Sequence, residues 1–433
     1  MKLLTLILFL LNFQILYSQS GWITQNSGTT DPLFDTYFFD MNTGIIVGGT
    51  AINTAIILRT TNGGSDWDSI SPNTTVLLRG IEFTNSSTGF VVGGNATQSV
   101  ILKTTNSGLD WSPVNIPTSD ALRSVSFPPT GTGFVGYTVG FNGIVFKTID
   151  GGNNWSIQPT NIGTIQLFAV HFTDALTGTA VGGSQFDTAT IIRTTNGGTN
   201  WIQQNPNTTN LLRGVYFINS NTGFAVGNNG TILKTSDGGN NWIVKSTTQF
   251  LFLRDIYFAN SVTGFIVGSG GKIFRTTDSG NNWDSIPSGT NNDLQGVHFI
   301  NEFVGTAVGF NGTIIHTNSG GISSSQNTTE AIPLSYTLFQ NYPNPFNPKT
   351  IINYLIPSNV KRLPDGMAGQ TSNVKLIIYD VLGNEFSTLV NEIESPGIYE
   401  VEFNGESFSS GIYYYSLFID SKRVDTKRMA LLK

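Results

Sequence analysis

Short apolar runs alternate with polar, glycine-rich turns along most of the chain, and one arrangement of these runs recurs seven times. Each copy holds an apolar strand ending near a Phe, a glycine-flanked aliphatic strand, a strand with a basic residue, and a strand that follows a tryptophan. The tryptophans lie 41 to 46 residues apart, at Trp22, Trp67, Trp111, Trp155, Trp201, Trp242 and Trp283. A period of about 40–45 residues with four short strands is typical of a β-propeller. We therefore expect an all-β, seven-bladed β-propeller.

A tight turn precedes each repeated strand that a tryptophan opens, with the pattern Thr-x-Asn/Asp-x-Gly-x-x-Trp, as in Thr148, Asp150, Gly152 and Trp155. Asn and Asp side chains bond backbone amides two residues on, and Gly supplies the positive φ of such turns. The motif resembles the Asp-box of sialidase-type propellers. We interpret its Asn and Asp residues as turn formers, not as ligands or catalysts. They are Asn62, Asn106, Asp150, Asn196, Asp237 and Asp278.

The seventh copy, from His316 to Gly321, lacks its tryptophan, because Ser324 stands where one is due. The missing tryptophan is Trp22, at the other end of the chain. We therefore expect Gly21 to Ser27 to supply the outer strand of the last blade. This closure removes free sheet edges.

Composition and charge narrow the possible functions. Only 12% of the 433 residues are charged, the net charge is −6, and there is no cysteine. A chain without a basic excess is a poor nucleic-acid binder, and disulfide or thiolate chemistry is excluded. The three histidines, His171, His298 and His316, fall in different repeats without a ligand pattern. We expect neither a metal nor another cofactor.

The chain is expected to have four segments. Residues 1–18 read as a signal peptide, with Lys2 before the apolar run Leu3 to Leu11. The propeller covers residues 19–322, a polar linker 323–334, and a small β-sandwich domain 335–433. No other run is long enough to span a membrane, so we expect no transmembrane segment after signal cleavage.

The last domain carries a series of ordered motifs, including Leu338 to Pro348, Ile378 to Gly383, Ser410 to Tyr415 and Lys427 to Lys433. It resembles the C-terminal sorting domain of type IX secretion cargo; the alternative is an ordinary Ig-like domain. The resemblance implies export across the inner membrane by a Sec signal, then passage of the outer membrane to the exterior or cell surface. The type IX machinery would be a partner, and Lys361 to Asn373 reads as an inserted hairpin loop. The sorting signal would include Gly411, Lys427 and Lys433.

One column of residues at the start of the first strand of each repeat is rich in arginine. Its members are Phe34, Arg79, Arg123, Phe168, Arg213, Arg254 and Gln295. In a propeller these positions ring one mouth of the central channel, and clustered guanidiniums favour an anion between them. We predict that Arg79, Arg123, Arg213 and Arg254 bind an anionic group of a partner. The alternative is pairing with Asp120, Asp255, Asp293 or loop carbonyls, and the non-basic members interrupt the ring.

The repeats also resemble those of the photosystem II assembly and stability factor family, through the Gly-Phe-x-Val-Gly strands and the Asp-boxes. That resemblance covers residues 19–322 and implies an arginine-rich propeller face. Longer loops at Thr50 to Ala55, Asn95 to Ser99 and Ser184 to Thr190 are expected on the same face.

A second basic column precedes the Asp-boxes and is expected to be structural, with its stems over the tryptophan of the same hairpin. Its members are Arg59, Lys103, Lys147, Arg193, Lys234 and Arg275, with His316 last.

The sequence therefore favours a secreted or cell-surface binding protein, with an extracellular protein or glycan as partner, and not an enzyme. The alternative is a polysaccharide-active or sialidase-like glycoside hydrolase. Such an enzyme would need two carboxylates about 5–10 Å apart in an open cleft. The candidates are Asp35, Asp120, Asp255 and Asp293, with Glu82 and Glu302 as the propeller's only glutamates.

Overall fold

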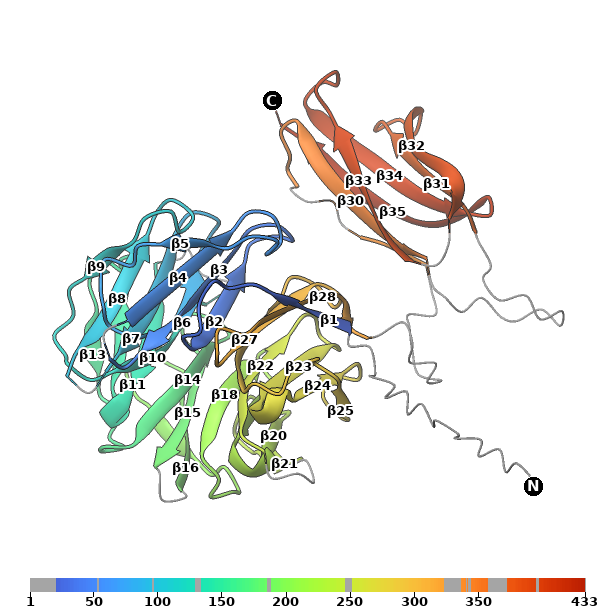
Figure 1. Cartoon of the computed structure of the whole chain (residues 1–433). Coiled ribbons are helices and arrows are strands. Elements are labelled where there is room, and N and C mark those ends of the chain that lie inside the picture. Colours follow the sequence, from blue (N-terminus) through green and yellow to red (C-terminus); the bar gives the residue numbers. More distant parts are fainter. Residues whose placement is uncertain are drawn as a thin grey trace, which may run out of the picture. The chain divides into compact units, whose positions relative to one another are not determined.

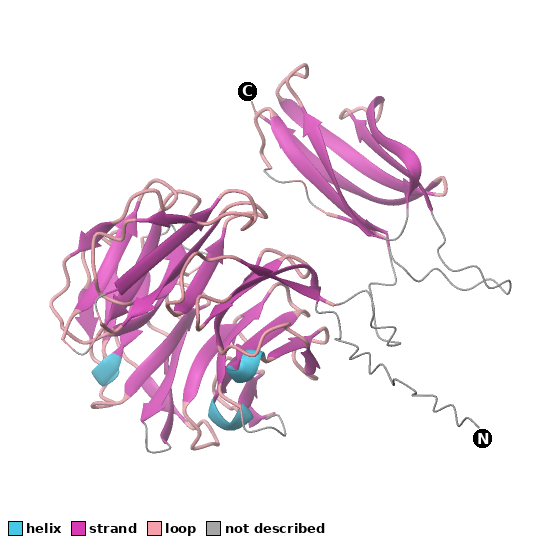
Figure 2. Cartoon of the chain, viewed as in Figure 1, coloured by secondary structure: helices cyan, strands magenta, loops and turns pink. Residues whose placement is uncertain are grey.

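The computed structural model describes residues 21–322, except 53, 96, 129–133, 185–187 and 246–250, and residues 336–432, except 340, 342–343, 357–371 and 395–396. The predicted signal peptide, the linker and Lys433 lie outside the described residues. The chain divides into two compact units, Met1–Gln326 and Asn327–Lys433. Figure 2 shows that both are built from strands, with three 3-10 turns, η1 (Phe141–Gly143), η2 (Asn228–Gly230) and η3 (Ser269–Gly271), in the first unit.

The first unit is a seven-bladed β-propeller of four-stranded antiparallel sheets, which confirms the predicted fold (Figure 1). The inner strands are β2 (Leu33–Phe38), β6 (Leu78–Phe83), β10 (Leu122–Ser126), β14 (Gln166–Phe172), β18 (Leu212–Phe217), β22 (Leu253–Phe258) and β26 (Leu294–Phe299). The second strands are β3 (Gly44–Thr50), β7 (Gly89–Gly94), β11 (Gly136–Gly140), β15 (Gly178–Ser184), β19 (Gly223–Gly227), β23 (Gly264–Gly268) and β27 (Gly305–Gly309).

The two remaining strands of each blade flank the Asp-box. The third strands are β4 (Thr54–Thr60), β8 (Ser99–Thr104), β12 (Val145–Thr148), β16 (Thr188–Thr194), β20 (Ile232–Thr235), β24 (Ile273–Thr276) and β28 (Ile314–Gly321). The outer strands are β5 (Asp68–Ile70), β9 (Ser112–Val114), β13 (Ser156–Gln158), β17 (Ile202–Gln204), β21 (Ile243–Val244), β25 (Asp284–Ile286) and β1 (Gly21–Gln25).

The repeated Phe, Gly and Trp positions form one packing unit in every blade. Phe83, at the end of β6, covers Gly89, where an added Cβ would come within 2.5 Å of the ring. The edge of Trp111 then meets the Phe83 ring, with centroids 6.0 Å apart and planes at 77°. The glycine is therefore required because the phenylalanine occupies the space of its side chain.

The ring closes as the sequence predicts. The strand β1 pairs with β28 in antiparallel register, with Ile23 opposite His316 and Gln25 opposite Ile314. Trp22 lies edge-on to Phe299, with ring centroids 5.8 Å apart, as the other tryptophans lie on their own blades. The displaced tryptophan therefore completes the packing unit of the last blade.

Every inner strand contains a β-bulge at the same place. The register with the second strand shifts between Leu78 and Gly80, so Arg79 is the extra residue of β6. The same shift occurs in the other six inner strands, each time directly after a leucine near the start of the strand. A bulge leaves one residue without a partner and changes the direction of its side chain.

The second unit has two antiparallel sheets around one apolar core. One sheet is β29 (Thr337–Leu338), β30 (Lys349–Ile356) and β33 (Gly397–Asn404); the other is β31 (Ser372–Tyr379), β32 (Glu385–Glu394), β34 (Gly411–Ile419) and β35 (Lys422–Leu431). Ser372, the first residue of β31, pairs with Glu394 of β32. The predicted inserted loop, Lys361 to Asn373, therefore ends before Ser372. The rest of that loop, residues 361–371, lies outside the described residues.

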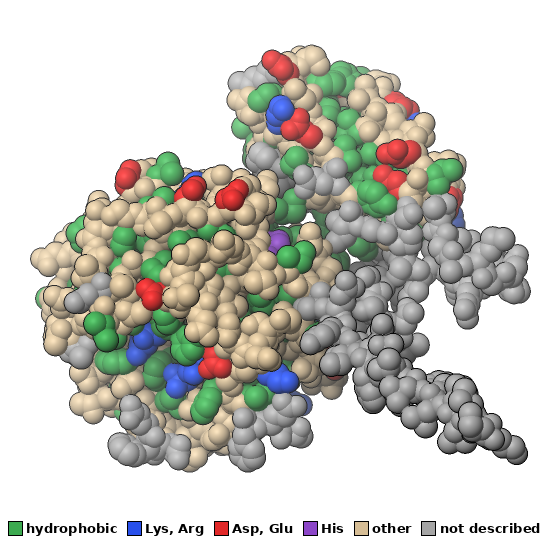
Figure 3. Space-filling model, in the orientation of Figure 1, with side chains coloured by type: hydrophobic (Ala, Val, Ile, Leu, Met, Phe, Trp, Pro, Cys, Tyr) green, Lys and Arg blue, Asp and Glu red, His purple; other side chains and the backbone are tan. Residues whose placement is uncertain are grey.

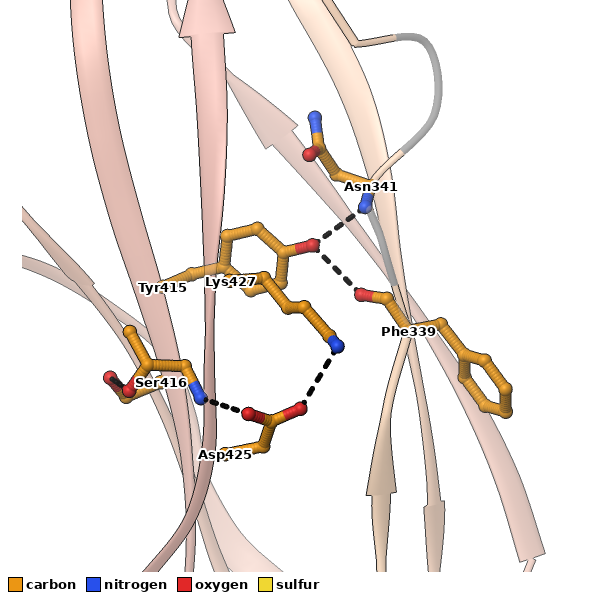
Figure 4. A network of polar contacts seen from close by, with 7 residues as sticks. Phe339, Asn341, Tyr415, Ser416, Asp425 and Lys427 are labelled. Atoms are coloured by element: carbon orange, nitrogen blue, oxygen red, sulfur yellow. Dashed lines mark hydrogen bonds and ion pairs between the residues drawn. The ribbon is translucent and has the colours of Figure 1, made fainter.

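Two residues predicted for the sorting signal lie on neighbouring strands of this unit. Gly411 opens β34 opposite Leu431, and Lys427 lies in β35, where its ammonium is 3.1 Å from the Asp425 carboxylate. Figure 4 shows the nearby Tyr415, whose hydroxyl donates to the Phe339 carbonyl at 2.8 Å and accepts from the Asn341 amide at 2.6 Å. These bonds tie the segment before β30 to the strand beside Lys427.

Candidate functional site

The bulge residues of all seven inner strands line one cavity of about 470 Å³, which we call the arginine mouth. In a regular strand successive side chains point to opposite faces of the sheet. The bulge breaks this alternation, and the side chain of the extra residue turns into the cavity. Their positions bring together residues that are about 40 residues apart in sequence. They are Phe34, Arg79, Arg123, Phe168, Arg213, Arg254 and Gln295.

Two phenylalanines lie between the arginines of this mouth. The guanidinium carbon of Arg79 is 3.9 Å from the centroid of Phe34, and that of Arg213 is 5.0 Å from the centroid of Phe168. Arg123 also approaches Phe168, at 5.5 Å. The rings interrupt the basic column, as the sequence indicates, but each of them contacts a neighbouring guanidinium. Their faces attract the cations, and they separate the guanidiniums without neutralising them.

The arginine mouth has little negative charge to balance it. Arg254 lies 4.0 Å from the Asp293 carboxylate, and Arg213 donates to the Asn228 side chain at 3.1 Å. The residues that line the cavity include no Asp or Glu. The buried Nε atoms of Arg79, Arg123 and Arg254 have no hydrogen-bond partner among the described residues. The excess positive charge is therefore available to an anion.

The acidic partners proposed as an alternative are engaged elsewhere, apart from Asp293. Asp120 accepts from the Asn142 amide at 2.7 Å, and Asp255 accepts from the backbone N–H groups of Ile256 and Val297. Burial, followed by repulsion from the other three guanidiniums, lowers the pKa of Arg79 well below its ordinary range. An anion in the cavity would relieve both effects.

One of the longer loops reaches this cavity. Thr50 and Ala51, at the turn between β3 and β4, contribute to its lining. The turn is held by a 2.7 Å hydrogen bond between the hydroxyls of Thr50 and Thr54. The loop therefore adds shape to one side of the arginine mouth.

The Asp-box side chains close their own turns. The Asp150 carboxylate accepts from the Thr148 hydroxyl at 2.9 Å and from the backbone N–H of Asn153 and Asn154. Hydrogen bonds from the Asn154 side chain and backbone, above all, lower the pKa of Asp150 to about 2. The turn-closing bond to the preceding threonine recurs at Asn62, Asn106, Asn196, Asp237 and Asp278.

The basic column before the Asp-boxes links neighbouring blades. Lys103 donates to the Gly151 carbonyl at 2.7 Å and to the Asn153 side chain at 2.8 Å, both in the Asp-box of the next blade. Its ammonium lies 5.6 Å from the centroid of Phe90, on the strand beside it. The predicted contact with the tryptophan of the same hairpin is therefore wrong in its partner. The structural role comes from the turn of the following blade.

Three carboxyls line a second cavity, farther along the inner strands. Asp35 accepts from the Ile81 backbone N–H at 2.9 Å, and the backbone N–H of Phe127 donates to Glu82. Asp255 likewise accepts from the next blade. Burial raises the pKa of Asp35 to about 8, with Asp255 adding to the effect, and raises that of Glu82 to about 8. These carboxyls satisfy edge amides of the channel wall and do not line the arginine mouth.

The second cavity also brings His171 and His298 together, although they lie in different blades. The two histidines hold equivalent places in their repeats, and the ring of blades brings these places to one cavity. No cluster of three or more His, Asp or Glu suited to a metal ion occurs in the described part of the chain. The described helices are all too short to cross a membrane.

Comparison with known proteins identifies the family. A profile described as photosynthesis system II assembly factor YCF48 matches residues 65–201 and 195–290, which together span more than half of the chain. The chain belongs to the YCF48 family. No curated protein sequence gives a significant match.

Solved YCF48 structures share the propeller. The chain is similar to YCF48 bound to a D1 peptide, with 19% identity and a TM-score of 0.56 over 70% of this chain and 96% of that one. YCF48 from Cyanidioschyzon merolae gives 18% identity and a TM-score of 0.54, over 69% and 98%. A GH74 xyloglucanase from Xanthomonas campestris gives 9% and 0.55, over 78% and 59%. These likenesses concern the fold, whereas the family assignment rests on the profile.

Proposed function

We propose that this YCF48-like chain is a secreted or cell-surface binding protein whose arginine mouth captures a carboxylate of a protein partner. The observation that carries the proposal is the convergence of Arg79, Arg123, Arg213 and Arg254 on one cavity without a carboxylate in its lining. A free peptide end or an acidic side chain matches this chemistry, because guanidiniums bind carboxylates through paired hydrogen bonds.

The related YCF48 structure with a bound D1 peptide supports a peptide as the class of partner. The lining of the mouth agrees with a peptide end, since it combines aromatic rings with guanidinium N–H groups. Phe34 and Phe310, with ring centroids 6.2 Å apart, give one wall an apolar surface. A glycan without acidic groups would leave the arginines unbalanced.

The site does not favour the alternative, a glycoside hydrolase. Hydrolysis by two carboxylates requires both to face the substrate in one cleft. Asp35 and Asp255 each accept two backbone N–H bonds, and both lie in the second cavity. Asp120 and Asp293 line neither cavity.

Export to the cell exterior is the second part of the proposal and rests on sequence. The terminal domain resembles type IX sorting domains through motifs that include Gly411 and Lys427, and residues 1–18 resemble a Sec signal. The sparse charge of the propeller surface is compatible with an extracellular protein; Figure 3 shows few charged side chains among hydrophobic and uncharged ones on the visible face.

The binding proposal is tested with the full mature chain and acidic peptides in two forms, one with a free C-terminal carboxylate and one amidated. The free form should bind more tightly, and its binding should weaken as salt is raised. Equal binding of both forms would move recognition to acidic side chains. Binding of neither form, with folded protein, would contradict the proposal.

A further inference from the structure

A second cavity of about 450 Å³ lies toward the ends of the inner strands, and we call it the aromatic cavity. Its ionisable groups are acidic, whereas those of the arginine mouth are basic. Asp35, Glu82 and Asp255 line it, and its lining includes no Lys or Arg. The central channel therefore has a basic mouth and a separate acidic cavity, and only the first is used by the proposed function.

Five of the seven equivalent positions around the aromatic cavity carry rings, and these rings form a continuous arc. The centroids of Tyr37 and His298 are 4.9 Å apart, and those of His298 and Tyr257 are 4.8 Å apart. Tyr216 follows at 5.4 Å, and His171 at 4.8 Å from Tyr216. The planes of neighbouring rings are tilted by 40 to 57° to one another. An aromatic ring carries an electron-rich face, which attracts a positive group placed against it.

The two remaining positions close the circle with oxygen atoms. Ser126 is uncharged, and its hydroxyl accepts a hydrogen bond from the Phe172 backbone N–H at 3.2 Å. Glu82 supplies a carboxyl, which accepts from the Phe127 backbone. The circle therefore consists of five rings, a hydroxyl and one carboxyl.

Two imidazole nitrogens in this circle are unsatisfied. The buried Nδ1 atoms of His171 and His298 have no hydrogen-bond partner within the described residues. Burial lowers the pKa of both imidazoles to about 4, so at neutral pH they are uncharged rings. Burial, with Asp35 as a further cause, raises the pKa of Glu82. A positive group beside Glu82 would remove that penalty.

We infer that the aromatic cavity binds an organic monocation, an alkylammonium or guanidinium group, between its ring faces and the Glu82 carboxyl. Aromatic rings around a desolvated cation attract it through their quadrupoles, and one carboxylate completes its charge. A hard divalent metal would require several oxygen ligands, and no such cluster occurs among the described residues. This inference does not depend on the arginine mouth.

The test is calorimetry of the mature chain with choline, with methylguanidinium, and with 3,3-dimethylbutanol, the uncharged isostere of choline. At least one of the two cations should bind, and the neutral isostere should bind at least about tenfold more weakly. A peptide with a single trimethyllysine between uncharged residues carries the same ammonium group on a protein side chain. Comparing this peptide with free choline distinguishes a protein ligand from a small-molecule ligand. Tighter binding of the peptide indicates a protein side chain, and tighter binding of free choline indicates a small molecule.

Two variants make the outcome decisive. Glu82→Gln should weaken cation binding at least about tenfold and leave the neutral isostere unchanged. Asp68→Asn, on the exposed strand β5, makes the same change of charge outside the cavity and should have no effect. Tyr257→Leu should weaken binding if Glu82→Gln fails to fold. Equal binding of the isostere and cations, absence of cation binding, or binding unaffected in the folded variants would overturn the inference.

Discussion

The guanidinium carbon of Arg79 lies 3.9 Å from the centroid of the Phe34 ring, across the junction of two blades. The contact explains how four arginines share one mouth. An aromatic face attracts a cation and leaves its charge in place, whereas a carboxylate would attract the cation and also neutralise it. The phenylalanines thereby orient the arginines for a partner that carries the opposite charge.

We expect Phe34→Leu to weaken binding of acidic peptides by about 2- to 30-fold, the range of one desolvated cation–π contact. Melting temperature should change little, since leucine keeps an apolar side chain at the half-buried position. Peptide titration of both proteins measures the effect. Phe252→Leu is the matched control, because its more exposed ring lies 5.6 Å from Arg254, and its effect should be smaller.

Replacing Trp111 by alanine should lower the free energy of unfolding by about 3–5 kcal/mol, the usual cost of truncating a fully buried large ring. Trp111 is 1% exposed and meets Phe83 edge-on. Trp67, which is only half-buried, should cost less when truncated in the same way. Denaturant unfolding compares the two, and equal costs would contradict the packing account.

Deleting residues 19–30 should open the ring. The deletion removes β1, the outer strand paired with β28, and leaves the seventh blade with an unpaired edge. We expect a sharply lower melting temperature and a tendency to aggregate. Trp22→Ala, which keeps the strand but removes its ring, should give an intermediate loss. A truncated protein that melts like the full chain would refute closure by β1.

Stability should fall as pH rises from about 6.5 to 8. The folded-state pKa values of Asp35 and Glu82, raised by burial to about 8, exceed their unfolded values of roughly 4. Their contribution is full below the unfolded values and is lost as pH rises through the folded ones. The histidines act oppositely, because the pKa of His171 and of His298 is lowered to about 4, so their contribution is lost only in acid.

Thermal melts at pH 6.5, 7.25 and 8 measure this dependence. Glu82→Gln should reduce the slope, since it removes one of the two titrating groups. Glu302→Gln, outside the aromatic cavity, serves as the control and should keep the slope of the parent. A parent chain with a flat profile would contradict the burial of these carboxyls.

Removal of residues 335–433 should retain the propeller in the periplasm of a bacterium with type IX machinery. The terminal domain carries the proposed sorting motifs, including Gly411 and Lys427. Deleting only residues 361–371 should leave export intact, because they belong to the predicted insertion. Fractionation of cells and medium distinguishes these results. Export without the terminal domain would exclude its role as a sorting signal.

Most of the fold follows from the sequence because seven copies of one pattern reinforce each other. The Phe, Gly and Trp positions mark the packing unit directly, and the absent seventh tryptophan identified β1 as the closing strand. The orientation of the Arg79 side chain could not be predicted from the repeat, since it depends on a bulge in β6. No residue type in the sequence marks the position of that bulge. The repeat and the propeller geometry placed the column at one mouth of the channel, whereas the bulge itself was not predicted.

Contacts between blades were the least predictable. The sequence placed Lys103 beside the tryptophan of its own hairpin, but its ammonium reaches the Asp-box of the next blade. Likewise, His171 and Glu82 lie in different repeats, and the circular arrangement of the blades places both in the wall of one cavity. Such neighbours are set by the geometry of the ring, because they lie in different repeats.

The most direct test of the proposed binding function is the affinity of the mature chain for an acidic peptide after Arg79, Arg213 and Arg254 are together changed to Gln. A chain with Lys349, Lys422 and Arg423 changed to Gln carries the same loss of charge on exposed positions of the second unit. We predict at least about a 100-fold loss of affinity in the first variant, because charged hydrogen bonds contribute roughly 1.5 kcal/mol or more each. The second variant should bind like the parent, and both should melt like it. Unchanged affinity of the folded first variant would contradict the account.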